Sequence, residues 1–132
     1  MANYNRLFDD SYTRVHVNFD EFIAEFYKSF STSSNDINRL FSNTDMDKQK
    51  NMLKKSFEHL LKFHYSKNST DELVKLAQLH RDMEVTEDMY ADWMQSLLDA
   101  VRVVDYECNN EIELAWRIVL APGIEFMKHV DK

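Results

Sequence analysis

Hydrophobic side chains recur at steps of three and four residues along most of the chain, a spacing typical of amphipathic α-helices. The clearest run has apolar positions at Phe19, Phe22, Ile23, Phe26, Tyr27 and Phe30. A polar stretch, STSSN, separates this run from the short segment DINRLF, which carries Ile37, Leu40 and Phe41. We therefore expect a helix with an aromatic inner face, followed by a corner.

The next periodic segment begins near residues that can cap a helix. Thr44 or Asp45 can supply the N-terminal cap. The inner face of this segment consists of Met46, Gln49, Leu53, Phe57, Leu60, Leu61 and His64. This pattern predicts a long helix, and Gln49 is its unusual inner member.

The stretch LVKLAQLHRDMEV predicts a further helix with a histidine among its apolar positions. Ser69 and Glu72 have the spacing of a capping box just before it. Leu73, Leu76 and Ala77 precede His80 at spacings that place all four on one side of the helix. His80 should therefore point in the direction of the apolar side chains.

Two more helices complete the expected set. A short helix within residues 1–17 is expected at the start of the chain. Thr86 can cap the first of the two. Its inner face consists of Tyr90, Trp93, Met94, Leu97, Leu98 and Val101. The last helix begins near Asn110, and its inner positions are Ile112, Trp116, Val119, Met127 and Val130.

Composition supports an all-α fold. The 132-residue chain contains one glycine and one proline, Gly123 and Pro122, whereas sheet proteins need turn residues at short intervals. The length is that of one domain, residues 1–132, with a core large enough to fold without disulfides.

Charge and cysteine content narrow the range of partners and compartments. The formal net charge is −7, which makes nucleic acid and anionic membranes unexpected partners and favours small ligands or proteins. Cys108 is the single cysteine, so an internal disulfide is excluded. With no signal-peptide pattern and no apolar run of membrane-spanning length, we expect a cytoplasmic protein.

Among the polar side chains at inner positions, three stand out: Tyr27, Gln49 and His80. An unsatisfied buried polar group costs about 1–3 kcal/mol, so each needs a partner or a function. Each one alone has an ordinary structural explanation, because a core histidine, tyrosine or glutamine can find a hydrogen-bond partner. Together they suggest an oxygen site, since imidazole is a good iron ligand while a phenol and an amide donate hydrogen bonds to a partly negative ligand.

The segment FYKSFSTSSNDINRLFSNTDMDKQKNML, followed by LAQLHRDMEVTEDMY, resembles the globins. Among them it is most similar to truncated haemoglobins and to the haem domain of flavohaemoglobins, which implies a bacterial single-domain globin. The later segments LLDAV and IVLAP match the later helices of truncated haemoglobins, and the resemblance extends from about Phe19 to Val130. It implies a globin-like helical sandwich enclosing a haem, in the full or the shortened two-over-two form.

The resemblance also assigns roles to residues. His80 matches the proximal histidine, which implies that it binds the iron of haem b (iron protoporphyrin IX). Tyr27 and Gln49 match distal positions that donate hydrogen bonds to an iron-bound ligand. The remaining haem-contact positions implied by the resemblance are Phe41, Leu53, Leu76, Val85, Tyr90 and Trp93. His64 or Tyr27 could instead bind the iron in the absence of a gas ligand.

The function implied by the resemblance is binding of O2, and also of NO or CO. Tight oxygen binding would suit conversion of NO to nitrate, a nitric oxide dioxygenase activity that would need a separate reductase. A haem-based gas sensor and a haem-free globin-fold regulatory protein are the alternatives. Candidate partners for the haem propionates are Lys48, Lys50, Lys54, Lys75 and Arg81, although each is equally well explained as a solvated surface charge.

Overall fold

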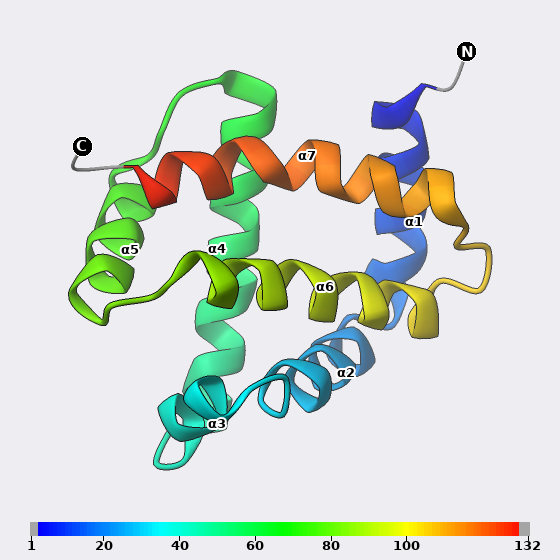
Figure 1. The fold of residues 1–132 in the computed structure, drawn as a ribbon. Helices are drawn as coiled ribbons and strands as arrows, with labels where there is room; N and C mark the ends of the chain where they lie inside the picture. The colour runs from blue at the N-terminus through cyan, green and yellow to red at the C-terminus, as the bar shows by residue number, and fades with distance from the viewer. Residues whose placement is uncertain (1–2, 130–132) are drawn as a thin grey trace. The chain divides into compact units, whose positions relative to one another are not determined.

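The computed structural model describes residues 3–129, and this part of the chain forms seven α-helices and no strand (Figure 1). The helices are α1 (Tyr4–Val17), α2 (Phe19–Phe30), α3 (Asn35–Phe41), α4 (Met46–Ser66), α5 (Asp71–Asp82), α6 (Glu87–Val104) and α7 (Asn110–Lys128). The all-α prediction is confirmed, and every expected helix is present. Val130, predicted to lie on the inner face of the last helix, is outside the described residues. Within residues 3–129, no helix is both long enough and apolar enough to cross a membrane.

Side-chain caps begin α4 and α6 as the sequence predicts. Of the two candidates for α4, the cap is Asp45, whose Oδ1 accepts hydrogen bonds from the backbone N–H groups of Asp47 at 3.1 Å and Lys48 at 3.3 Å. Thr86 Oγ1 accepts from the N–H of Met89 at 3.2 Å. These bonds satisfy amide groups that have no partner within the first turn of a helix.

The cap of α5 differs from the prediction. The capping box of Ser69 and Glu72 was wrong, because the N-terminal cap is Thr70, whose Oγ1 accepts from the N–H of Leu73 at 3.1 Å. The same Oγ1 forms a 3.1 Å hydrogen bond with His59 Nδ1 on α4. Thr70 therefore accepts a hydrogen bond from an amide at the start of α5 and also links this helix to α4.

Two helix-terminal turns use left-handed backbone without glycine. Lys67, which ends α4, has a φ of 62°, and Glu84, just after α5, has a φ of 60°. A side chain at such a φ crowds the following carbonyl oxygen, so each position carries backbone strain. The one glycine is placed elsewhere, inside α7.

The described residues group into two compact units, each built from separate stretches of the chain. Unit 1 comprises residues 3–44 and 91–118, and unit 2 comprises residues 45–90 and 119–129. Unit 1 therefore contains α1, α2, α3, most of α6 and the first part of α7, whereas unit 2 contains α4, α5, the start of α6 and the rest of α7. The prediction of one domain is not tested by this grouping and stays a prediction.

The core of unit 1 is centred on Trp116, which has no exposed surface. Its ring packs edge-to-face against Phe8 of α1, with centroids 4.8 Å apart, and lies 6.0 Å from Phe22 of α2. Leu97 and Leu98 of α6 are also fully buried. The neighbouring helices α1 and α2 and the first part of α7 therefore contribute to one aromatic cluster.

Unit 2 is held by packing of α4 against α5 and against the second part of α7. Leu73 and Ala77 are the buried positions of α5. At the approach of α7 to α4, a Cβ atom on Gly123 would lie 2.5 Å from Leu60 Cδ2, and the rings of Phe63 and Phe126 are 5.2 Å apart. A side chain at position 123 would therefore require the Leu60 side chain to move.

Candidate functional site

His80 lies in the last turn of α5, with its imidazole half-buried. Burial lowers the pKa of His80, because the charged form loses hydration when the ring leaves water. The ring is therefore neutral near pH 7 and keeps one nitrogen lone pair available to a ligand or hydrogen-bond donor. This is the form in which histidine binds metals.

One imidazole nitrogen has a neighbour on α6. Tyr90 Oη lies 3.4 Å from His80 Nδ1, a long hydrogen bond, and the two ring centroids are 6.1 Å apart. Burial raises the pKa of Tyr90, so the phenol stays protonated. A contact at Nδ1 orients the imidazole and leaves Nε2 as the nitrogen available for another partner.

The backbone after His80 is also fixed. The N–H of Val85 donates to the carbonyl oxygen of His80 at 3.0 Å, and the N–H of Glu84 donates to that of Arg81 at 3.0 Å. Glu84 adopts the left-handed conformation that lets the chain turn back in this way. The C-terminal turn of α5 is therefore closed immediately after the candidate ligand.

The other predicted site residues of unit 2 lie on α4 and α5 and in the turn after α5. Gln49 and Leu53 are one helical turn apart on α4, and Leu53 is buried whereas Gln49 is half-buried. Leu76 on α5 and Val85 after it are both half-buried. These four residues and Tyr90 belong to the same unit as His80, and most of them are apolar.

The predicted site residues of unit 1 form an aromatic cluster. Tyr27 on α2 is 5% exposed, and its ring meets Phe41 edge-to-face at a centroid distance of 5.7 Å. Phe26 contacts both Tyr27, at 4.9 Å, and the half-buried Trp93 of α6, at 5.8 Å. The structure thus brings together Tyr27, Phe41 and Trp93 in unit 1, and His80 and Tyr90 in unit 2.

The remaining candidates are less enclosed. Arg81 is exposed and pairs with Asp82 at 3.0 Å, and Lys48 and Lys75 are exposed. Lys50 and Lys54 are half-buried on α4. Their assignment to haem propionates stays a prediction.

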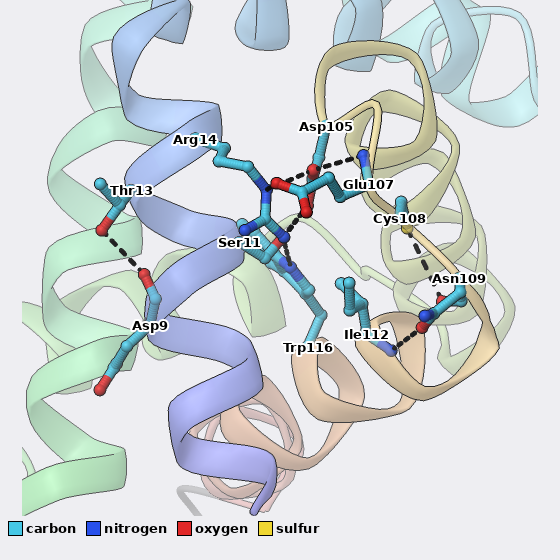
Figure 2. Close-up of polar contacts among 10 residues, drawn as sticks. All are labelled: Asp9, Ser11, Thr13, Arg14, Asp105, Glu107, Cys108, Asn109, Ile112 and Trp116. Atoms are coloured by element: carbon cyan, nitrogen blue, oxygen red, sulfur yellow. Dashed lines mark hydrogen bonds and ion pairs between the residues drawn. The ribbon is translucent and has the colours of Figure 1, made fainter.

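A buried polar network in unit 1 was not anticipated from the sequence (Figure 2). The Asp105 carboxylate, which has no exposed surface, accepts hydrogen bonds from Arg14 Nε at 2.6 Å, Arg14 Nη2 at 3.0 Å and Ser11 Oγ at 2.6 Å. The backbone N–H of Glu107 donates to it at 3.0 Å, and Trp116 Nε1 donates to Ser11 Oγ at 2.9 Å. The only signal in the sequence was the spacing of Ser11, three residues after Phe8 on the inner face of α1.

His80 offers one imidazole nitrogen, which is the number of protein ligands that an iron porphyrin needs for its attachment. Within residues 3–129, no three side chains of His, Cys, Asp or Glu gather into a group that could hold a metal ion. A porphyrin supplies four nitrogen ligands itself, so a single neutral imidazole is sufficient to complete its attachment. The neutral His80 ring, with Nδ1 facing Tyr90, meets that requirement.

Comparison with solved structures identifies one closely similar chain. The crystal structure of protein PA3967 from Pseudomonas aeruginosa PAO1, described as structurally highly homologous to a human hemoglobin, has a TM-score of 0.85 to this chain. The two sequences are 31% identical over 96% of each chain. No protein-family model matches the chain, and no curated protein matches it. The globin-like fold predicted from the sequence is therefore confirmed.

Proposed function

Since the chain belongs to the haemoglobin-like family that includes PA3967, we propose that it binds haem b through His80 and uses it to bind O2, NO or CO. The observation that carries this proposal is the geometry of His80, whose half-buried imidazole has Nδ1 3.4 Å from Tyr90 Oη. Burial also lowers the pKa of His80, which favours the neutral ring. The resemblance to truncated haemoglobins and to the haem domain of flavohaemoglobins supports the same assignment.

In this proposal, His80 holds its one proton on Nδ1 and donates it in a hydrogen bond to Tyr90 Oη. Nε2 then keeps the lone pair that binds iron, because a neutral imidazole carries a proton on only one nitrogen. The Val85 N–H bond to the carbonyl oxygen of His80 limits movement of the backbone that carries the ring. Together, these contacts orient the His80 imidazole before haem binds.

When bound, the haem would supply reversible binding of O2, NO or CO and, with an electron returned by a separate reductase, conversion of NO and O2 to nitrate. The chain's contribution on the ligand side is hydrogen bonding by the phenol of Tyr27 and the amide of Gln49. Hydrogen bonds to charged acceptors contribute about 1.5–3 kcal/mol each, so two would slow ligand release strongly. Slow release suits NO dioxygenation in the cytoplasm better than oxygen delivery.

Apolar side chains would exclude water from the cofactor. Phe41, Leu53, Leu76, Val85 and Trp93 are the residues proposed for this role, and each is buried or half-buried. A water-poor surrounding strengthens each hydrogen bond that reaches a charged group.

The visible absorption spectrum of the purified protein tests the proposal directly. It should be recorded as purified, after dithionite, and after air or carbon monoxide is admitted. We expect an intense Soret band that shifts with each treatment and is lost or altered in His80→Ala, whereas His16→Ala, at an exposed position of α1, leaves it unchanged. No Soret band, even after haem is added, would favour a haem-free regulatory protein. Haem binding without NO turnover in the presence of a reductant would favour a gas sensor.

A further inference from the structure

Lys128, at the end of α7, lies over the aromatic ring of Tyr90. Its Nζ is 5.7 Å from the ring centroid, within the range of a cation–π interaction. The Lys128 side chain is only 20% exposed, whereas lysines normally extend their ammonium groups into water. Its Nζ is also 3.1 Å from Oε1 of Glu125, three residues earlier on α7.

The same tyrosine contacts His80. Lys128 meets the face of the ring, while the hydroxyl at its edge lies 3.4 Å from His80 Nδ1. All three residues belong to unit 2. A 3.4 Å bond is at the long end of the range for hydrogen bonds, so a small rotation of the Tyr90 ring would break it.

We propose that Lys128 is a positioning residue for His80, because its ammonium holds the Tyr90 ring where the hydroxyl can accept a hydrogen bond from His80 Nδ1–H. This inference rests on the proposed function, in which Nε2 is the iron ligand. It adds a charged pair on α7, Lys128 with Glu125, to the residues that determine how strongly His80 binds.

The Glu125 carboxylate determines whether loss of the Lys128 ammonium weakens or strengthens the hydrogen bond between His80 and Tyr90. An isolated ammonium beside the ring would make the phenol a weaker acceptor and so weaken the bond from His80. The carboxylate 3.1 Å from Nζ opposes the field of the ammonium at the hydroxyl, while the short-range attraction of the ammonium to the ring face remains. Removing the ammonium therefore weakens the His80–Tyr90 bond instead of strengthening it.

The iron–histidine stretching frequency of the ferrous protein, measured by resonance Raman, reports this bond. A hydrogen bond from Nδ1–H makes the imidazole more basic and raises the frequency. We expect Tyr90→Phe to lower it, Lys128→Met to lower it by part of the same shift, and Lys128→Arg to restore it. Haem loss should be roughly two- to fivefold faster in Lys128→Met. Lys62→Met, at an exposed position of α4, is the matched control.

An unchanged or raised frequency in Lys128→Met, beside a lowered one in Tyr90→Phe, would overturn the inference. If the purified chain shows no Soret band, the proposed function fails, and the inference is read instead from the ¹⁵N shifts of His80 in the same chain. Proton occupancy at Nδ1 that falls in Lys128→Met and returns in Lys128→Arg supports the positioning role. Occupancy that is the same in all three proteins contradicts it.

Discussion

Arg14 and Asp105, 91 positions apart in the chain, meet in unit 1 through a 2.6 Å hydrogen bond from Nε to Oδ1. The carboxylate is completely buried, whereas the guanidinium side chain is 21% exposed. The pair joins α1 to the turn between α6 and α7, with Ser11 and Trp116 completing the network. A buried carboxylate depends on its partners, because water cannot replace them.

Replacing Arg14 by methionine should destabilise the protein considerably. Asp105 would be left as a buried charge with fewer partners, a change that typically costs about 3–5 kcal/mol. Because Arg14 is partly exposed, we expect the lower part of that range. The measurement is the free energy of unfolding from denaturant titration. Arg39→Met is the control, since Arg39 pairs with Asp36 at the exposed surface and should cost about 1 kcal/mol or less.

Stability should fall in acid in a way that depends on Asp105. Burial by itself would raise the pKa of Asp105, but hydrogen bonds from Arg14, Ser11 and the Glu107 N–H outweigh it, and the pKa lies below its ordinary value. A lowered carboxyl pKa contributes stability above the unfolded pKa of about 4, and this contribution disappears as pH falls through the folded pKa. We expect Asp105→Asn to be less stable at pH 7 and to lose less stability on acidification. Parallel pH profiles of the two proteins would contradict this.

Gly123→Ala should destabilise unit 2 even though alanine is the better helix former. The new Cβ would lie 2.5 Å from Leu60 Cδ2, so the buried Leu60 side chain must move. Overpacking of this kind costs about 1–3 kcal/mol, more than the gain in helix propensity of up to about 1 kcal/mol. Combining it with Leu60→Ala should cost less than the sum of the two single changes. Ala121→Gly, at an exposed position of α7, measures the propensity term alone.

Glycine should stabilise the two left-handed helix ends. Lys67→Gly and Glu84→Gly remove the clash of a Cβ at φ near 60°, and we expect each to raise the free energy of unfolding by up to about 1 kcal/mol. Lys62→Gly, inside α4, should have the opposite sign and cost about 1 kcal/mol. A loss of stability at both helix ends would show that the lysine and glutamate side chains contribute more than the strain.

Tyr27→Phe should raise the rate of oxygen dissociation at least tenfold if Tyr27 donates a hydrogen bond to the bound ligand. Loss of one hydrogen bond to a charged acceptor, about 1.5–3 kcal/mol, corresponds to a factor of that size. Stopped-flow displacement of oxygen by carbon monoxide measures the rate. The same rate in both proteins would remove Tyr27 from the distal site. Tyr12→Phe, in α1 beside Trp116, is a tyrosine control in the same unit.

The spacing of apolar residues predicted the helices. It did not predict the exact residue at which each helix begins, because that depends on which of two adjacent polar residues forms the N-terminal cap. Thr44 and Asp45 are both good caps, as are Ser69 and Thr70, and the sequence alone does not show which one takes the extended conformation. Asp45 does so before α4. Thr70 does so before α5, where it also reaches His59, a contact that depends on the packing of two helices.

The candidate site was predictable only where its residues follow a local pattern. His80 could be placed on an apolar helix face from spacing alone, and its partial burial agrees with that placement. The contact of Lys128 with Tyr90 joins distant parts of the chain, and no local pattern encodes it. Apolar periodicity does not indicate Ser11, because the pattern is defined by apolar residues and a buried serine is not one of them, although Ser11 has no exposed surface.

The bond from the Val85 amide to the carbonyl oxygen of His80 gives the protein an internal reporter of its own flexibility. The hydrogen on this amide can exchange with solvent only when the last turn of α5 opens. Its exchange rate therefore measures how often the backbone that carries His80 is released. The protection of this one amide against exchange can then be used to compare the effects of cofactor binding, of substitutions on α7 and of a glycine at residue 84.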